Sequence, residues 1–231
     1  MVRIALASLI FLSATIVGGV GHVYAQYANA PKVITVKPTG VYAEIDTKKT
    51  FEAVAGLRAA DVQSVTNRIK DIEANAPTYQ PPVFLVLAQV LFAQGKVESA
   101  AYWYHVGWLR ARYDANRCAQ MTAKQAVQTM ISQTSREFVL RVFGDAALIA
   151  RVLPKVVKWD EEAPYSYDHR WINLHGSESA MSGVIPISGA PPVLSLPESD
   201  WPAIAKKTRE DFVRDVENLA RNVQSLQPVA K

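Results

Sequence analysis

Apolar residues recur at helical spacing along most of the chain after residue 47. The clearest stripes lie at residues 61–74 and 199–225, and each repeats at intervals of three or four: Val62, Val65, Ile69 and Ile72 in the first, and Ile204, Phe212, Val216, Leu219 and Val223 in the second. This spacing places apolar side chains on one face of a helix. Five more helices are expected at residues 51–57, 83–94, 97–113, 122–133 and 135–157, the last divided by Gly144 and Pro154. The pattern predicts a mainly α fold, a multi-helix bundle.

Two regions depart from this periodicity. Residues 32–36 and 41–45 flank the turn residues 38–40, which favours two short extended segments. Residues 159–197 lose the helical pattern and contain five prolines. We therefore expect an N-terminal extended segment at 26–46, a helical domain at 47–158, an irregular aromatic and proline-containing segment at 159–198, and a C-terminal helix within 199–231 that packs on the same domain.

The first 25 residues have the layout of a secretory signal peptide. A short positive start with Arg3 precedes an uncharged, mostly apolar run at 4–20, and Val23 and Ala25 stand three and one positions before a cleavage point. We expect cleavage between Ala25 and Gln26, which predicts a periplasmic or secreted protein; a retained anchor is the alternative. No membrane span is expected after cleavage, because no later segment is long and apolar enough.

Residues 81–114 carry a second pattern, in which large and small residues alternate around a glycine. Its positions are Phe84, Leu87, Ala88, Leu91, Gly95, Ala100, Tyr104 and Gly107. At this spacing the segment resembles one tetratricopeptide or Sel1-like helical hairpin, with Arg112 at the place of the family's final proline. The resemblance implies two helices whose backbones approach closely at the small residues.

The second helix of this hairpin is apolar in almost every direction. On a helical wheel of residues 100–113, only His105, Arg110 and Arg112 interrupt the apolar and small side chains. A helix of this kind belongs in the middle of a bundle. A partly buried arginine requires an acidic or carbonyl partner, so we assign Arg110 and Arg112 structural roles. The acidic run at residues 160–162 offers partners: Asp160, Glu161 and Glu162.

Composition and cysteine usage narrow the classes of partner. The chain has 49% hydrophobic and 20% charged residues, which is ordinary for a folded protein, and a formal net charge of +4 without a lysine or arginine block. Such a mild excess does not predict nucleic-acid binding. Cys118 is the only cysteine, so no internal disulfide can form; a buried thiol is favoured over a nucleophile or an intermolecular bridge.

The segment 165–176 concentrates the residues that could carry chemistry. Asp168, His169 and His175 are weak catalytic candidates, because a carboxylate beside a histidine can orient a general base, and two histidines with an aspartate can ligate zinc. Their spacing matches no recognised ligand pattern, so no metal site is assigned. Partner-binding candidates are Tyr165, Tyr167, Arg170 and Trp171. No motif for a phosphate, a dinucleotide or another cofactor occurs, and none is expected.

These observations favour an exported, helical protein-binding or scaffold protein that acts without catalysis. One specific form of this hypothesis is an inhibitor or immunity protein. The alternative is an envelope hydrolase that uses Asp168, His169 and His175 with Arg110 or Cys118 nearby. A third hypothesis is a small-molecule binder built around Trp103 and Trp108.

Overall fold

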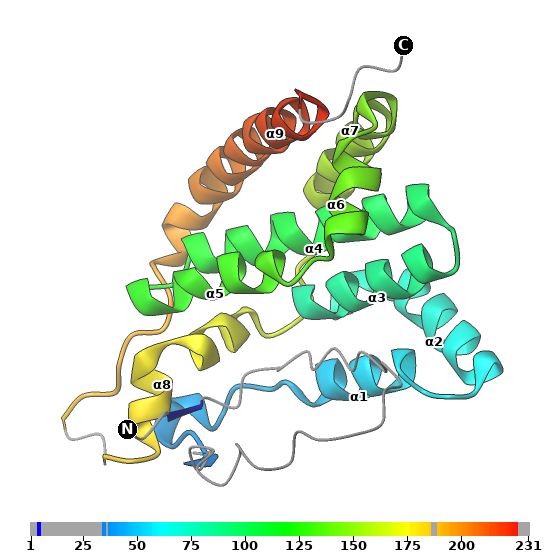
Figure 1. Cartoon of the computed structure of the whole chain (residues 1–231). Helices are drawn as coiled ribbons and strands as arrows, with labels where there is room; N and C mark the ends of the chain where they lie inside the picture. Colours follow the sequence, from blue (N-terminus) through cyan, green and yellow to red (C-terminus); the bar gives the residue numbers. More distant parts are fainter. Residues whose placement is uncertain (1–3, 6–33, 36, 186–188, 226–231) are drawn as a thin grey trace, which may run out of the picture.

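The computed structural model describes residues 4–5, 34–35, 37–185 and 189–225 (Figure 1). In chain order its elements are β1 (Ile4–Ala5), β2 (Ile34–Thr35), the 3-10 helix η1 (Gly40–Tyr42), α1 (Lys48–Leu57), α2 (Val62–Ala74), η2 (Ala76–Thr78), α3 (Pro81–Ala93), α4 (Val97–Asn116), α5 (Met121–Ser132), α6 (Arg136–Phe143), α7 (Ala146–Glu162), η3 (His169–His175), α8 (Ser177–Ser182), η4 (Glu198–Asp200) and α9 (Trp201–Ser225). This confirms a mainly α, multi-helix bundle. The predicted cleavage point lies outside the described residues.

Helix α4 occupies the centre of the bundle. It contacts α3, α5, α6, α7, α9 and η3, and in Figure 1 it crosses the middle of the molecule with α3 and α1 on one side and α7 and α9 on the other. Its buried side chains point in nearly every direction: Trp103, Tyr104, His105, Val106, Leu109, Arg110 and Tyr113. The apolar wheel of residues 100–113 therefore corresponds to a central helix.

Helices α3 and α4 form a closely packed hairpin. The turn passes through Gly95, whose φ of +75° suits a residue without a side chain. At Gly107, an added Cβ atom would lie 3.1 Å from Leu85 Cδ2, Phe84 Cβ and the Pro81 carbonyl oxygen. The glycine is thus needed for the close approach of the two helices, as the small-residue pattern implies.

Pro154 does not divide its helix, contrary to the prediction. Helix α7 runs from Ala146 to Glu162 with Pro154 in its interior, whereas the predicted break at Gly144 is correct, since Gly144 caps the end of α6. Pro154 lies on the exposed side of α7, and Leu153 and Val156 on either side of it are buried in the core. Burial of the face that carries Leu153 and Val156 outweighs the local cost of the proline. That cost arises because Pro154 has no N–H to donate to the Ala150 carbonyl.

The segment after α7 is more ordered than its composition suggests. Helix α7 extends four residues past the expected start of the irregular segment, and η3 and α8 lie within that segment. Residues of η3 join a second core cluster with the ends of α4 and α5, through Trp171, Ile172, Ala115 and Ala123. A 3-10 helix has three residues per turn, so its pattern escapes a search for the α-helical period.

The prediction of an extended segment at residues 41–45 is also wrong. Gly40 to Tyr42 form a 3-10 helix that begins at a glycine with a φ of +59°. Tyr42 is buried in the second core cluster, and its hydroxyl contacts Gln120 and Glu178. To bury the Tyr42 ring, the chain forms a 3-10 helix where the alternation of apolar and polar residues predicted a strand.

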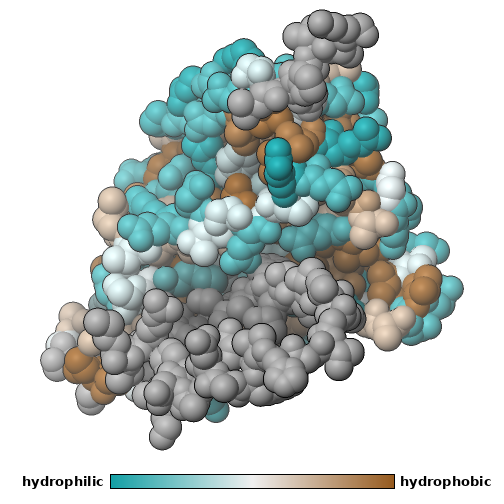
Figure 2. Space-filling model, viewed as in Figure 1, coloured by the Kyte–Doolittle hydropathy of each residue, from teal (hydrophilic) through white to brown (hydrophobic). Residues whose placement is uncertain are grey.

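Hydrophilic residues cover much of the visible face, and hydrophobic patches lie among them, including one at the upper end beside α7 and α9 (Figure 2). Within the described part of the chain, no helix has the length and apolar character required to cross a membrane. The hydrophobic patch beside α7 and α9 thus interrupts a largely hydrophilic face.

Candidate functional site

A buried ion pair ties the end of α7 to α4. Arg110 is 0% exposed and Asp160 2% exposed, and the Arg110 Nε donates to Asp160 Oδ1 at 3.2 Å. The other guanidinium nitrogens donate to the carbonyl oxygens of Ala163 and Pro164. Asp160 also accepts from Arg209 Nε of α9 at 2.8 Å. This arrangement joins three helices at one point and leaves the guanidinium facing protein, so Arg110 has a structural role.

Arg112 takes a different partner from the one expected. Its Nη2 donates to Asp215 Oδ2 of α9 at 2.8 Å, and not to an acidic residue at 160–162. Arg112 lies two residues from Arg110 on α4, so it points toward another part of the bundle, where α9 supplies the carboxylate. The sequence pattern identified the need for a partner but not which helix would supply it.

A second buried network holds two of the four residues expected to bind a partner, Tyr167 and Trp171. Asp114, at 0% exposure, accepts from Arg117 Nη2 at 2.7 Å, from Trp171 Nε1 at 2.7 Å and from the Tyr167 hydroxyl at 3.1 Å. Burial raises the pKa of Asp114 to about 6, although the Arg117 charge and these hydrogen bonds oppose the shift. Trp171 is 2% exposed, so it fastens the segment to α4 and offers no surface for a partner.

The three weak catalytic candidates face different neighbours. Burial acts to raise the pKa of Asp168, but hydrogen bonds from Arg170 outweigh it and hold the pKa below its usual value. His175 packs edge-on against Trp171, with ring centroids 5.6 Å apart. Its pKa is lowered to about 4 by burial. His169 instead contacts Ser195 and Trp201. In the described residues, no cluster of three or more histidine, cysteine or acidic side chains could hold a metal ion.

His169 has a partner that the sequence did not suggest. Its Nε2 lies 2.8 Å from the Ser195 hydroxyl, on a segment that pairs with the chain after α4 through a hydrogen bond from Ala119 N to the Leu194 carbonyl. Burial, together with the Arg117 charge, lowers the pKa of His169 to about 4, so the ring is neutral at pH 7. A neutral imidazole in contact with a hydroxyl can accept its proton, but a pKa of about 4 makes His169 a weak base.

Cys118 lies inside the second core cluster. Its thiol is 2% exposed and donates to Asn173 Oδ1 at 2.9 Å. Burial raises the pKa of this thiol, which suppresses the reactive thiolate. The side chain therefore behaves as a small buried hydrogen-bond donor.

Part of the aromatic segment does line a cavity. Tyr165, Ser166, Tyr167 and Asp168 border a polar cavity of about 430 Å³ together with residues of α1 and of the chain before α1 and α3: Asp46, Lys49, Thr50, Thr78 and Gln80. The Gln80 side chain donates to the carbonyl oxygens of both Asp46 and Asp168, at 2.7 and 3.1 Å. These contacts consume much of the cavity's hydrogen-bonding capacity, and neither His169 nor His175 lines it.

The two tryptophans of α4 are packed against other rings. Trp103 stacks on Phe84 with centroids 5.3 Å apart, and Trp108 meets the edge of Phe212 at 5.2 Å. A small-molecule site built on these indoles would have to displace core contacts.

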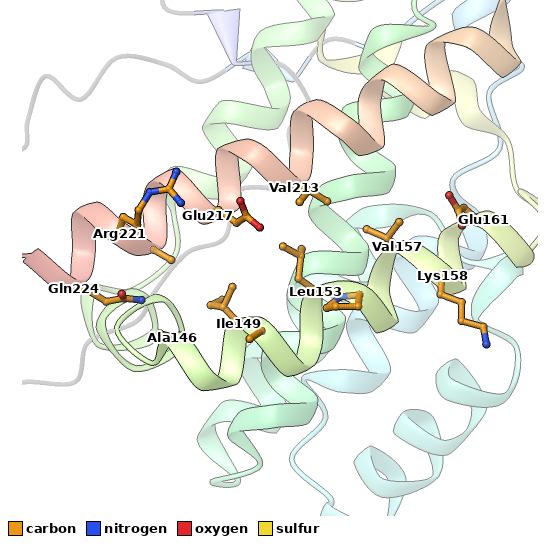
Figure 3. A pocket seen from close by; sticks show the side chains of 13 residues that line it. Ala146, Ile149, Leu153, Val157, Lys158, Glu161, Val213, Glu217, Arg221 and Gln224 are labelled. Carbon is orange, nitrogen blue, oxygen red and sulfur yellow. The ribbon is translucent and has the colours of Figure 1, made fainter.

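Among the described residues, a large cavity with a mostly apolar lining forms a groove between α7 and α9. The two helices run antiparallel, and side chains from both point into the space between them (Figure 3). We call this the α7–α9 groove; its volume is about 600 Å³ and its lining residues are Ala146, Ile149, Ala150, Leu153, Pro154, Val157, Lys158, Glu161, Val213, Glu217, Ala220, Arg221 and Gln224. The apolar side chains form its floor and walls, and the charged ones its rim.

Fixed contacts lie beyond both ends of the α7–α9 groove. At one end, Arg209 of α9 is paired with the buried Asp160 of α7. At the other end, the Gln224 side chain donates to the Phe143 carbonyl at the end of α6, at 3.2 Å. Helix α9 is thus held to α7 near one end of the groove and to α6 near the other, with an apolar opening between α7 and α9.

The sequence offered only indirect signals for this groove. The apolar stripe of α9 was predicted, and Pro154 was singled out, but as a helix break and not as a groove residue. Which face of α7 meets which face of α9 depends on the Arg209–Asp160 pair across the bundle, and local patterning does not contain that relation.

Comparison with known proteins identifies no relative. A scan against protein-family models, a search of curated proteins and a search of solved structures each found no match to this chain. The function therefore has to be argued from the sites themselves.

Proposed function

We propose that this chain is an exported, non-catalytic protein that binds a partner protein, and that the α7–α9 groove holds an amphipathic helix of that partner. The observation that carries the proposal is the apolar groove between α7 and α9, with α9 held to α7 near one end and to α6 near the other. Docking of an amphipathic helix into such a groove is a recurring mode of recognition. Export is supported by the signal-peptide pattern of residues 1–25.

The dimensions of the groove suit a short helix. Its wall on α7 extends from Ala146 to Glu161, and at 1.5 Å per residue this corresponds to about 22 Å, or four helical turns. The outer part of this wall consists of Ala146, Ala150 and Pro154, which are exposed and small and lie one turn apart. Small residues let a second helix approach closely, so the partner helix would present medium-sized apolar residues at intervals of three and four.

The charges on the rim favour a helical occupant with charges of its own. Glu217 and Arg221 lie one turn apart on α9, and Lys158 and Glu161 lie three residues apart on α7. Both rims therefore carry one acidic and one basic group. A partner helix with a basic residue opposite Glu217 and an acidic residue opposite Arg221 satisfies this pattern and fixes its own direction.

Positional photo-crosslinking tests this proposal. Benzoylphenylalanine is placed at Ala150, inside the groove, or at Lys206, which is exposed on α9 but does not line the groove, and cells expressing the full chain are irradiated. We expect an adduct with one other protein from position 150 and none from 206, and loss of that adduct in the Arg221→Glu chain. No adduct, equal adducts at both positions, or an adduct with a second copy of this chain would overturn the proposal.

A second candidate function is hydrolysis with Ser195 as nucleophile and His169 as general base. It rests on the 2.8 Å contact between the Ser195 hydroxyl and His169 Nε2. The serine proton would pass to Nε2 as the oxygen attacks an acyl carbon, Nε2 would return it to the leaving oxygen or nitrogen as the bond from that atom to the carbon breaks, and water would then hydrolyse the acyl–Ser195 ester. A fluorophosphonate probe that labels the wild type but not the Ser195→Ala chain would support this function. Absence of label in the wild type would remove it.

A further inference from the structure

A second large cavity lies on elements that the α7–α9 groove does not use. We call it the α3–α6 pocket; it has a volume of about 590 Å³ and is lined by Arg58, Leu85, Gln89, Phe92, Tyr104, Met130, Gln133, Thr134, Ser135 and Phe138. These residues come from α3, α4, α5, α6 and the end of α1. The volume lies in the range of small-molecule sites.

The floor of the α3–α6 pocket is apolar and largely aromatic. Leu85, Tyr104 and Phe138 are buried there, and Phe92 and Met130 form half-buried walls. The Phe138 ring lies 4.9 Å from Tyr104 and 5.0 Å from Phe92, tilted by 48° and 54°. Inclined rings of this kind present both faces and edges to an occupant. A flat apolar body is the shape that such a floor accepts best.

The mouth of the pocket is polar and favours an anion. Gln89, Gln133 and Ser135 are exposed at the mouth, and the Thr134 hydroxyl contacts the Tyr104 hydroxyl at 3.2 Å. Arg58 is the one charged residue among the described residues that line the pocket. Helix α6 begins at its N-cap Ser135 beside the mouth, and because Glu137 in its first turn offsets the positive end of the dipole, the Arg58 charge is the feature that favours an anion.

The geometry points to the α3–α6 pocket as a binding site for a small organic acid with a planar, apolar body. The body lies on Phe92, Tyr104 and Phe138, and the acidic group lies at the mouth beside Arg58 and the start of α6. The bound acid contacts α3, α4, α5 and α6 together. This site is independent of the α7–α9 groove, since the two share no lining residue.

Two fluorescent probes that differ in one group test this assignment. The probe 8-anilinonaphthalene-1-sulfonate is a planar apolar acid, and N-phenyl-1-naphthylamine has the same ring system without the sulfonate. Each is titrated into the purified full chain, into the variants Arg58→Gln and Gln89→Trp, and into Ala150→Glu, which alters only the α7–α9 groove. Circular dichroism of each variant confirms that it remains folded.

We expect Arg58→Gln to weaken binding of the sulfonate probe about fivefold and to leave the neutral probe unchanged, because only the acid uses the charge. Gln89→Trp fills the mouth and should weaken both probes at least tenfold, whereas Ala150→Glu should affect neither. Absence of sulfonate binding to the wild type, equal losses of both probes in Arg58→Gln, or loss of binding in Ala150→Glu would each overturn the assignment.

Discussion

Arg110 and Asp160 form an ion pair in the core although they are 50 positions apart in the chain. The guanidinium also lies 4.2 Å from the centres of the Trp159 and Tyr165 rings, so its charge is held by a carboxylate and two aromatic faces. The pair fixes the end of α7, and through Arg209 it fixes the start of α9 as well. The helices that border the α7–α9 groove are thus positioned by a buried charge cluster near one end of the groove.

Removing the carboxylate should destabilise the fold strongly. Asp160→Ala leaves the 0%-exposed Arg110 without its acidic partner, and breaking such a buried pair costs about 3–5 kcal/mol. The free energy of unfolding, measured by urea denaturation, should fall by that amount. Glu161→Ala, at an exposed position next to it, should change the same quantity by less than about 0.5 kcal/mol. Similar values for the two variants would show that Asp160 does not hold the bundle together.

Because three buried histidines have lowered pKa values, the free energy of unfolding should fall in acid. Burial is the main cause that lowers the pKa of His105, His169 and His175 to about 4, from an ordinary value of 6.5. Between pH 4 and 6.5 the unfolded chain binds protons that the folded chain does not, so their contribution is fully present above pH 6.5 and is lost as the pH falls toward 4.

His105 allows this contribution to be measured for one site. It is 1% exposed, and its Nδ1 lies 2.7 Å from the Ala101 carbonyl oxygen. His105→Leu should reduce the slope of unfolding free energy against pH between 5 and 6 by about 1 kcal/mol per pH unit. Ile149→Val, a core change without an ionisable group, should leave the slope unchanged. An unaltered slope in His105→Leu would contradict the lowered pKa.

The contribution of Asp114 to stability should depend on pH in the opposite direction from that of the histidines. Because burial raises its folded pKa to about 6 from an ordinary value of 3.8, its contribution is fully present below about pH 4 and is lost as the pH rises to 6. Asparagine does not titrate, so the stability of Asp114→Asn relative to the wild type should increase by about 2 kcal/mol between pH 4 and 7. Thermal unfolding of both chains across this range tests the sign. A relative stability that decreases with pH would contradict the account.

The contact at Gly107 predicts a cost that helix propensity alone would not. Alanine favours a helix over glycine by about 1 kcal/mol, but here the added Cβ would meet the Pro81 carbonyl oxygen at 3.1 Å. Gly107→Ala should therefore lower the free energy of unfolding by about 1–2 kcal/mol. Ser99→Ala, on the exposed face of the same helix, should leave it within about 0.5 kcal/mol of the wild type. A Gly107→Ala chain more stable than the wild type would show that the helices can separate without cost.

The sequence was most informative where a side-chain pattern has one structural solution. A helix that is apolar all round must lie inside a bundle, and residues 100–113 do so in α4. The need of Arg110 for an acidic partner followed from the same wheel, and Asp160 was among the partners considered. Arg112 shows the limit of this reasoning, because its partner Asp215 comes from a helix whose position depends on the whole bundle.

The sequence was least informative where tertiary contacts override local preference. Pro154 remains inside α7 because its neighbours Leu153 and Val156 are buried, and Tyr42 curls the chain that alternation assigned to a strand. The contact between His169 and Ser195 joins residues 26 positions apart that share no motif. The α7–α9 groove lies between helices that are not neighbours in the chain, and the α3–α6 pocket depends on how α1 and the consecutive helices α3 to α6 pack, so neither pattern nor propensity could locate them.

The central claim is that the α7–α9 groove binds a partner helix. Its most direct test is the affinity of the protein crosslinked at position 150, once purified, for the wild type and for the Ala150→Glu chain, with Lys206→Glu, a larger charge change outside the groove, as the control. A carboxylate buried against the apolar floor should weaken binding at least tenfold in Ala150→Glu, and Lys206→Glu should change it by less than twofold. Equal affinity for the wild type and Ala150→Glu would contradict the claim.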